Sequence, residues 1–175
     1  MIQEFAQVMG DQLKNVYLTS LITPGAGVEP LTLYMFDEPL PGARGYPYVL
    51  IHPGRSDEDM LTSGAPKVEA FYLIEVVDLY PGTTQDSSVA QLYQQRPMQL
   101  ADSIKELLRN DPVVRSLCLD FRCKLSRPTS TALPPAESQK RPDVQDIRQP
   151  LEIRATFNTN GGIYGYSLYG YSTYA

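Results

Sequence analysis

Few residues of the chain have the chemistry and spacing that catalysis requires. The sequence has one histidine, His52, which directly precedes the turn residues Pro53-Gly54. A histidine that acts as a general base needs an acidic partner and a nucleophile held within reach. As a lone histidine beside a turn, His52 is interpreted as structural or exposed. The alternative is a titratable cluster with Asp57, Glu58 and Asp59, which follow it closely in the sequence.

The cysteines and carboxylates do not form a recognisable metal motif. Cys118 and Cys123, with a single histidine, cannot complete a four-ligand zinc site without carboxylates. Asp57-Glu58-Asp59 is the sharpest acidic cluster, and clustered carboxylates suit a hard cation such as Ca²⁺. The cluster lacks the alternating spacing of a calcium loop, so a solvated acidic loop is the preferred interpretation. We expect neither a metal nor a cofactor.

The glycines do not form a nucleotide-binding motif. The chain has no G-x-x-x-x-G-K-[ST] phosphate loop and no G-x-G-x-x-G that opens a helix. The "GAG" at residues 25–27 follows an expected helix, which is the wrong context for a dinucleotide fold. We therefore predict that the protein is not an enzyme.

Composition is typical of a folded domain and argues against nucleic-acid binding. The 175 residues are 42% hydrophobic and 20% charged, which is ordinary for one globular domain with a real core. The net charge is −5, and the chain has no basic run with which to neutralise phosphates. The N-terminal twenty residues are too polar for a signal peptide or a membrane span, so we expect a reducing cytoplasm and free thiols.

Hydrophobic periodicity predicts two helices. Near the N-terminus, apolar residues recur at three- and four-residue steps, with Gly10 as the weak point of the pattern. These apolar residues are Ile2, Phe5, Ala6, Met9, Leu13, Val16 and Tyr17. The second helix is clearest from Leu100 to Leu108, and Asn110-Asp111-Pro112 ends it.

The remaining apolar segments are typical of strands. They cover residues 31–36, 48–52, 67–80, 117–125 and 151–157. From Leu117 to Leu125 the alternation places Cys118 and Cys123 on opposite faces, so we expect no disulfide between them. Strands grouped around two helices predict an α+β fold, in which two helices pack on one mostly antiparallel sheet.

Two segments do not fit this regular pattern. Residues 126–149 are rich in proline and are predicted to be a loop or arm inserted into a single domain of residues 1–160. Residues 161–175, here called the tyrosine tail, carry no Asp, Glu, Lys or Arg. The tail's tyrosines are Tyr164, Tyr166, Tyr169, Tyr171 and Tyr174. Because tyrosine offers a large contact area at low entropic cost, we predict that they dock onto a partner, with a mobile terminus as the alternative.

The order of these elements resembles that of the tail terminator proteins of tailed bacteriophages, of the lambda type. The resemblance rests on the N-terminal helix, the "VEAFYLIEVVDLY" strand, the "LADSIKELLRND" helix and two alternating strands. It covers roughly residues 1–125 and 149–160. It implies a hexameric ring that caps the tail tube, ends its polymerisation and joins the tail to the neck. Such proteins have no catalytic residues.

The resemblance also implies partners and a location. The partners would be copies of the same chain, the tail tube protein, a neck or connector protein and, in a contractile tail, the sheath protein. DNA would pass through the ring without specific binding, and the acidic loop Asp57-Glu58-Asp59 is a candidate for its lumen. The protein would be assembled in the host cytoplasm into the virion tail or neck, without a membrane. The arm at 126–149 and the tyrosine tail depart from the family pattern and would bind adjacent subunits or the neck.

Two other functions fit the same sequence. One is a head–tail connector or head-completion protein, because it too would be a ring-forming neck component. The other is a small binding module unrelated to viruses, which a monomer with a well-formed apolar pocket would favour.

Overall fold

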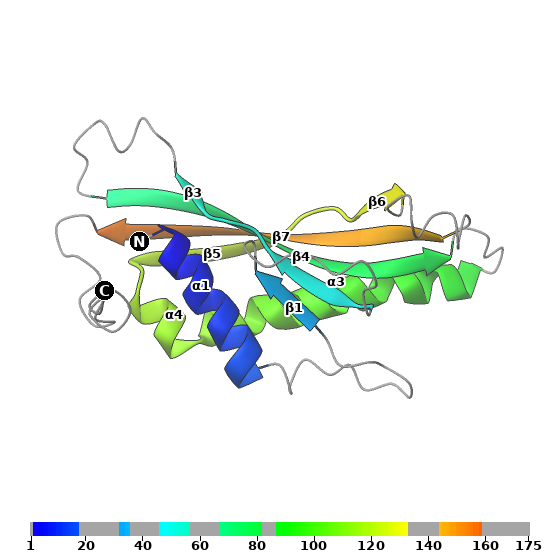
Figure 1. Ribbon diagram of the computed structural model, residues 1–175, viewed down its shortest axis with the longest axis horizontal. Coiled ribbons are helices and arrows are strands. Elements are labelled where there is room, and N and C mark those ends of the chain that lie inside the picture. The colour runs from blue at the N-terminus through cyan, green and yellow to red at the C-terminus, as the bar shows by residue number, and fades with distance from the viewer. Residues whose placement is uncertain are drawn as a thin grey trace, which may run out of the picture.

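A mixed sheet with helices on one face forms the described part of the computed structural model (Figure 1). The structure describes residues 2–17, 32–35, 46–56, 67–81, 87–132 and 144–158. The sheet has seven strands in the order β1-β2-β4-β7-β5, with β3 beside β4 and β6 beside β7. All pairs are antiparallel except β1 with β2. The predicted α+β class, with two main helices on a mostly antiparallel sheet, is therefore confirmed.

Two long strands form the centre of the sheet. β4 (Lys67–Pro81) and β7 (Val144–Asn158) pair along their whole length, from Lys67 opposite Asn158 to Pro81 opposite Val144. Shorter strands line both sides of this pair. They are β1 (Thr32–Met35), β2 (Tyr48–Ile51), β3 (Arg55–Ser56), β5 (Asp120–Leu125) and β6 (Thr129–Ala132).

The described helices all lie on the same face of the sheet (Figure 1). They are α1 (Ile2–Gln12), the π-helical turn η1 (Leu13–Tyr17), α3 (Ser87–Asn110) and the short α4 (Pro112–Ser116). α3 ends at Asn110 as predicted, and the Asp111 carboxylate then caps α4 by accepting a 2.8 Å hydrogen bond from the Val114 amide. Among the described residues, no helix covers the opposite face of the sheet, which is here called the free face.

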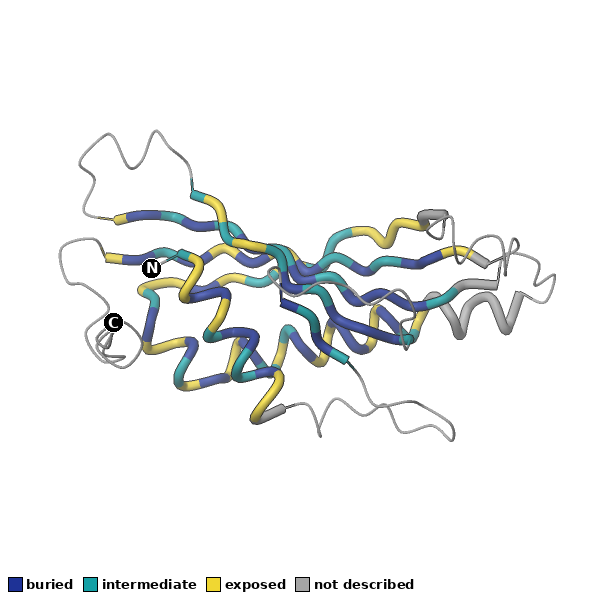
Figure 2. The backbone as a smooth tube through the Cα atoms, in the orientation of Figure 1, coloured by how far each residue is buried: buried dark blue, intermediate teal, exposed yellow. Residues whose placement is uncertain are grey.

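The hydrophobic core lies between the helices and the sheet. Phe5 of α1 is 1% exposed, and its ring centroid lies 5.4 Å from Tyr72, 6.1 Å from Phe121 and 5.0 Å from Phe157. In α3, the predicted apolar face is buried at Leu100, Ala101, Ile104 and Leu108. Figure 2 shows the resulting alternation of buried and exposed positions along the strands.

Gly10 leaves room for close packing of α1 against the sheet. A Cβ atom at this position would lie 2.2 Å from Met35 Sδ and 3.4 Å from Ile51 Cδ1. The residue that weakens the helical pattern in the sequence therefore lets α1 approach β1 and β2.

The strand predicted at 117–125 begins later than expected. α4 occupies residues 112–116, and β5 starts only at Asp120. Leu119, predicted to face the core, is 57% exposed. Cys118 and Cys123 both pack against the core, so the prediction of opposite faces is wrong. Because Cys118 lies in the connection between α4 and β5, strand alternation does not govern its direction.

The segment predicted as an arm is partly strand. β6 and the first half of β7 pair with each other, for example Thr129 with Arg148, while residues 133–143 lie outside the described residues. The prolines account for the wrong prediction. The Pro150 carbonyl accepts from the Ser126 amide, so the Pro150 nitrogen faces the same side, where β5 and β6 are interrupted. Its missing N–H therefore removes no hydrogen bond to β4.

Candidate functional site

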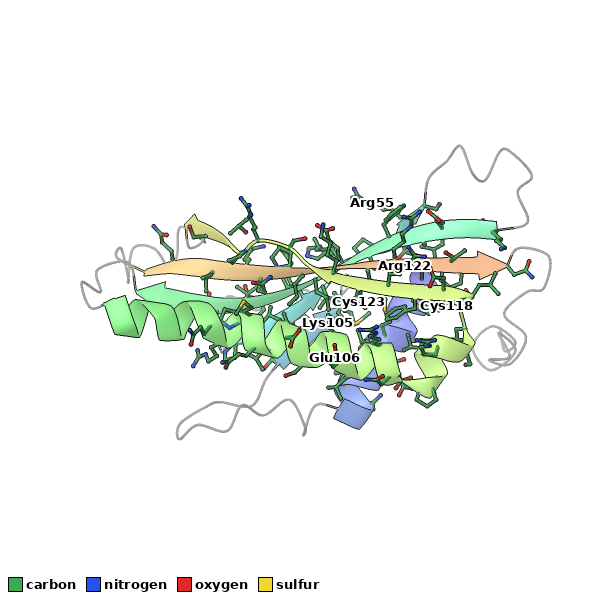
Figure 3. The ribbon with its side chains drawn as sticks, turned by 180° about the vertical axis from the view of Figure 1, so that it is seen from behind. Arg55, Lys105, Glu106, Cys118, Arg122 and Cys123 are labelled. Atoms are coloured by element: carbon green, nitrogen blue, oxygen red, sulfur yellow. The ribbon has the colours of Figure 1, made fainter. Side chains whose placement is uncertain are left out.

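The helix-free face of the sheet carries the polar side chains of the long strands. Along β4, Val68, Ala70 and Ile74 are buried beneath the helices, whereas Glu69 and Phe71 point to the opposite face and are half-buried. Seen from behind in Figure 3, Arg55 and Arg122 lie on this free face, away from α3. The free face therefore carries the polar and charged side chains that a binding site could use.

Both sides of the central β4–β7 pair carry a β-bulge. Between β2 and β3, the three residues His52-Pro53-Gly54 face two residues of β4, because Ile51 pairs with Ile74 and Arg55 with Phe71. Between β5 and β6, the three residues 126–128 face two residues of β7 in the same way. Such bulges bend a strand and redirect side chains.

The first bulge is held by glycine and by helix α1. A Cβ atom on Gly54 would lie 2.3 Å from Tyr72 Cε1 and 2.5 Å from Ile2 Cγ2, so only glycine fits without a shift. The Gln3 side chain donates to the Gly54 carbonyl at 2.9 Å and accepts from the Gly54 amide at 3.1 Å. These contacts fix the position of His52 at the edge of the free face.

His52 belongs to a charge network across three strands. Its Nε2 atom lies 2.6 Å from Glu75 Oε2, and Arg148 Nη1 approaches the same oxygen at 3.5 Å. The hydrogen bond from His52, together with the charges of His52 and Arg148, outweighs burial and lowers the pKa of Glu75. Within the described ranges, Glu75 is the one side chain that forms a hydrogen bond with His52.

The network continues from Arg148 to a buried carboxylate. Arg148 Nη2 lies 3.8 Å from Asp146 Oδ2, and the Tyr46 hydroxyl donates to Asp146 Oδ1 at 3.0 Å. Asp146 is 1% exposed, so these partners compensate its charge. The network thus joins β2, β4 and β7 through ion pairs. We interpret it as a set of contacts that stabilises the sheet.

Sequence reasoning missed Glu75 as the partner of His52. It considered Asp57, Glu58 and Asp59 instead, and these three residues lie outside the described residues. The sequence does show that Glu75 lies between apolar residues of the long strand and therefore points away from the core. Identifying the pair also requires the register of β2 on β4, which sequence alone does not give.

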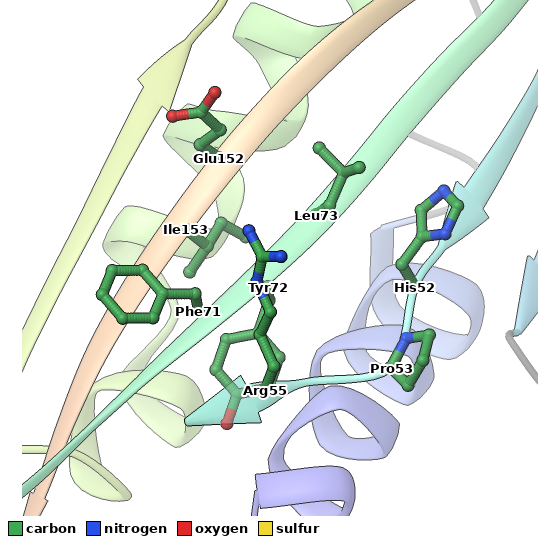
Figure 4. Close-up of a pocket in the computed structure, with 8 residues that line it drawn as sticks. All are labelled: His52, Pro53, Arg55, Phe71, Tyr72, Leu73, Glu152 and Ile153. Atoms are coloured by element: carbon green, nitrogen blue, oxygen red, sulfur yellow. The ribbon is translucent and has the colours of Figure 1, made fainter. Parts of the chain in front are cut away.

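A shallow hollow lies beside the first bulge on the free face. Its volume is about 390 Å³. It is lined by His52, Pro53, Arg55, Phe71, Tyr72, Leu73, Glu152 and Ile153. Figure 4 shows the Arg55 side chain extending over β4 between Phe71 and His52, with Glu152 on β7. The hollow therefore combines apolar rings with one guanidinium and one carboxylate.

The two cysteines lack the properties of reactive thiols. Both are free and half-buried, and burial raises the pKa of Cys118 to about 11 and that of Cys123 to about 12. At neutral pH both remain protonated, whereas nucleophiles and metal ligands need the thiolate. In the described ranges, no three His, Cys, Asp or Glu side chains come together as metal ligands.

The tyrosines predicted to dock onto a partner all belong to the C-terminal tail. Tyr164, Tyr166, Tyr169, Tyr171 and Tyr174 all lie outside the described residues. No helix in the described part of the chain is long and apolar enough to cross a membrane. No protein-family model matches the sequence, and no curated protein matches it either.

Proposed function

We propose that the protein is a structural subunit of a tailed-bacteriophage virion, which forms a ring at the top of the tail. The ring would end polymerisation of the tail tube and join the tail to the neck. The observation that carries this proposal is the two-layer architecture, in which every described helix covers one sheet face and leaves the other free. A subunit built this way can bury its core on one face and offer the other to neighbours.

The side chains of the free face suit contacts with other proteins. Arginine and aromatic residues are enriched at protein interfaces, and Arg55, Arg154 and Phe71 lie on this face. The partners in this proposal are copies of the chain, a hexamer by family resemblance, together with the tube protein and a neck or connector protein. A contractile tail would add the sheath protein.

The segments outside the described residues have roles in the same proposal. The tyrosine tail docks onto a neighbouring copy or the neck, and Asp57-Glu58-Asp59 forms an acidic loop at the lumen. An acidic lumen repels the phosphate backbone, so DNA slides through without specific binding. The subunits assemble in the host cytoplasm and remain in the virion, without a metal or cofactor.

The solution mass of the full chain tests this proposal. Light scattering is expected to give a ring-sized oligomer, or a monomer that assembles when purified tail tubes are added. Truncation after Asn160 is expected to weaken assembly, because it removes the tyrosines. A chain that stays monomeric at all concentrations and does not bind tail tubes would overturn the proposal.

The hollow favours a second candidate, a small binding module. Its mixed lining of Phe71, Leu73, Arg55 and Glu152 could hold a small polar ligand. A stable monomer that binds such a ligand would support this function. A connector or head-completion protein differs from a terminator in its partner, since it would bind the portal rather than the tail tube.

A further inference from the structure

Three arginines and a phenylalanine form a straight row across the free face. Arg122 of β5 pairs with Arg154 of β7, Arg154 pairs with Phe71 of β4, and Phe71 pairs with Arg55 of β3. Directly opposed residues of antiparallel strands point to the same face, and strands lie about 4.8 Å apart. The four side chains, here called the arginine row, therefore span roughly 14 Å on the free face.

Folding alone does not explain the arginine row. The side chains of Arg122 and Arg154 are 73% and 48% exposed, so they contribute little to the core. Like charges placed directly opposite each other destabilise a sheet, and Arg122 faces Arg154 in this way. The row has the features of a binding surface.

The carboxylates around the row favour an uncharged ligand. Arg122 Nε donates to Asp120 Oδ2 at 2.7 Å, and Arg154 pairs with Glu69. An acidic ligand would have to displace these carboxylates. Since carboxylates bond the edges of a guanidinium, its flat faces remain available for stacking on aromatic rings. Arg154 already uses one face in this way, because its Cζ atom lies 5.7 Å from the centroid of the Phe71 ring.

The hollow extends the arginine row at its β3 end. Arg55 and Phe71 belong to both, and no carboxylate among the described residues pairs with Arg55 (Figure 4). A volume of about 390 Å³ is large enough to admit an aromatic ring. The row and the hollow together offer guanidinium faces and an apolar ring, the chemistry that recognises tyrosine.

The chain itself contains an uncharged segment rich in tyrosine. In the tyrosine tail, Tyr164 and Tyr166 are two residues apart, as are Tyr169 and Tyr171. In an extended chain such pairs place their rings on one side, about 7 Å apart. The tail follows β7, which ends at Asn158, and residues 159–175 can reach roughly 55 Å when extended. That reach is sufficient to cross onto another subunit.

We propose that the arginine row of one copy binds the tyrosine tail of a second copy. Tyrosine rings stack on the faces of Arg55, Arg122 and Arg154 and on Phe71, and one ring enters the hollow. The exposure of Arg122 and Arg154 in the single chain leaves the row open to this second copy. The inference rests on the self-association in the proposed function and identifies the surface that receives the tail.

Cleavage by chymotrypsin, which cuts after tyrosine, tests the contact in the full chain. Cleavage within residues 161–175 is followed by mass spectrometry over a range of protein concentrations, with the solution mass measured in parallel. Wild-type tails are expected to be protected wherever the solution mass shows that copies have assembled, and to be cleaved where it shows a monomer. Replacing Arg55, Arg122 and Arg154 together with glutamine should remove this protection, at roughly two- to fivefold faster cleavage per arginine lost.

Two matched variants separate stacking from charge and from general effects. A control that changes Lys105, Arg109 and Arg115 to glutamine removes three cations outside the row and should leave tail protection at the wild-type level. Changing the three row arginines to lysine keeps the charge and removes the planar faces, so protection should fall to a level between those of the wild type and the glutamine variant. The lysine variant also serves if the glutamine variant fails to fold.

The possible results distinguish failure of the arginine row as the tail-binding surface from failure of the proposed ring. If both the wild type and the lysine variant form rings and their tails are equally protected, the arginine row does not bind the tail. The proposed ring would be unaffected by that result. Protected tails in a sample whose solution mass is that of a monomer would show that the tail binds its own chain, which would contradict binding to a second copy. A monomer at every concentration, even with tail tubes, would overturn both.

Discussion

The two faces of the sheet are formed by the same strands but differ in their side chains: one face is apolar and covered by helices, and the other carries paired charges. On β4, Ile74 and Val76 are completely buried under the helices, while Glu75 between them faces the other side and joins an ion network. The covered face contributes burial of apolar area, which is the main favourable term in folding. The free face contributes paired charges, which are worth little when exposed. Substitutions should therefore separate the two faces by their effect on stability.

Removal of an aromatic ring should have its largest effect on the covered face. Phe5→Ala is expected to lower the free energy of unfolding by about 3–5 kcal/mol, because Phe5 is 1% exposed and contacts three other rings. Phe71→Ala on the free face is the matched control and should cost about 1 kcal/mol. Urea unfolding measures both, and equal losses would contradict the distinction between the faces.

An ion pair should show the same contrast. The Asp78 carboxylate is 0% exposed and receives two 2.5 Å hydrogen bonds from Arg96, which link β4 to α3. Arg96→Met leaves this charge buried with its main partner removed and should cost about 3 kcal/mol. Arg122→Met breaks the exposed pair with Asp120 and should change stability by less than about 1 kcal/mol.

The pair Asp78–Arg96 can be tested further by removing its charge. Combining Arg96→Met with Asp78→Asn should recover part of the stability lost in the single variant, because no buried charge remains. Thermal unfolding measures the stability of the two single variants and the double variant relative to the wild type. A double variant that is no more stable than Arg96→Met alone would contradict this account of the pair.

Periodicity predicted much of the covered face. The alternation of Leu151, Ile153, Ala155 and Phe157 in β7 and the spacing of Phe5, Ala6 and Met9 in α1 place apolar residues where the core lies. Elements without a repeating pattern were missed. α4 is too short to show a helical period, and the prolines concealed β6 and the first half of β7.

The free face could not be predicted in the same way, because its sites depend on register. Arg122 and Arg154 have outward positions in their own strands, yet only the pairing of β5 with β7 sets them side by side. The same holds for His52 and Glu75, which meet across β2 and β4. Local patterns determine which way a side chain points, whereas its neighbours depend on how distant strands align.

The bulge at residues 52–54 joins the two faces and should be sensitive to one methyl group. Gly54→Ala places a Cβ atom against the rigid Tyr72 ring and should cost roughly 1–3 kcal/mol. Gly10→Ala is the matched control. Its nearest atom is the flexible end of Met35, and alanine also favours the helix, so the loss should be smaller. Thermal unfolding of the two variants compares them, and a larger loss at Gly10 would contradict the rigid-contact argument.

The ion network of the free face should have a small and pH-dependent effect. Because the pKa of Glu75 is lowered in the folded protein, its contribution is complete above the ordinary value of 4.5 and is lost as the pH falls below it. Glu75→Gln should therefore cost on the order of 1 kcal/mol at pH 7 and progressively less in more acidic solution. Urea unfolding from pH 7 to pH 3 measures this difference.

The outward residue Glu69 offers a control on the same strand, since its partner Arg154 is 48% exposed. Glu69→Gln should change stability less than Glu75→Gln at pH 7, because water screens the more exposed pair. If the cost of Glu75→Gln stays constant between pH 7 and pH 3, the pairing of Glu75 with His52 and Arg148 does not stabilise the fold. In that case the ionised Glu75 would contribute nothing to the stability of the free face through this network.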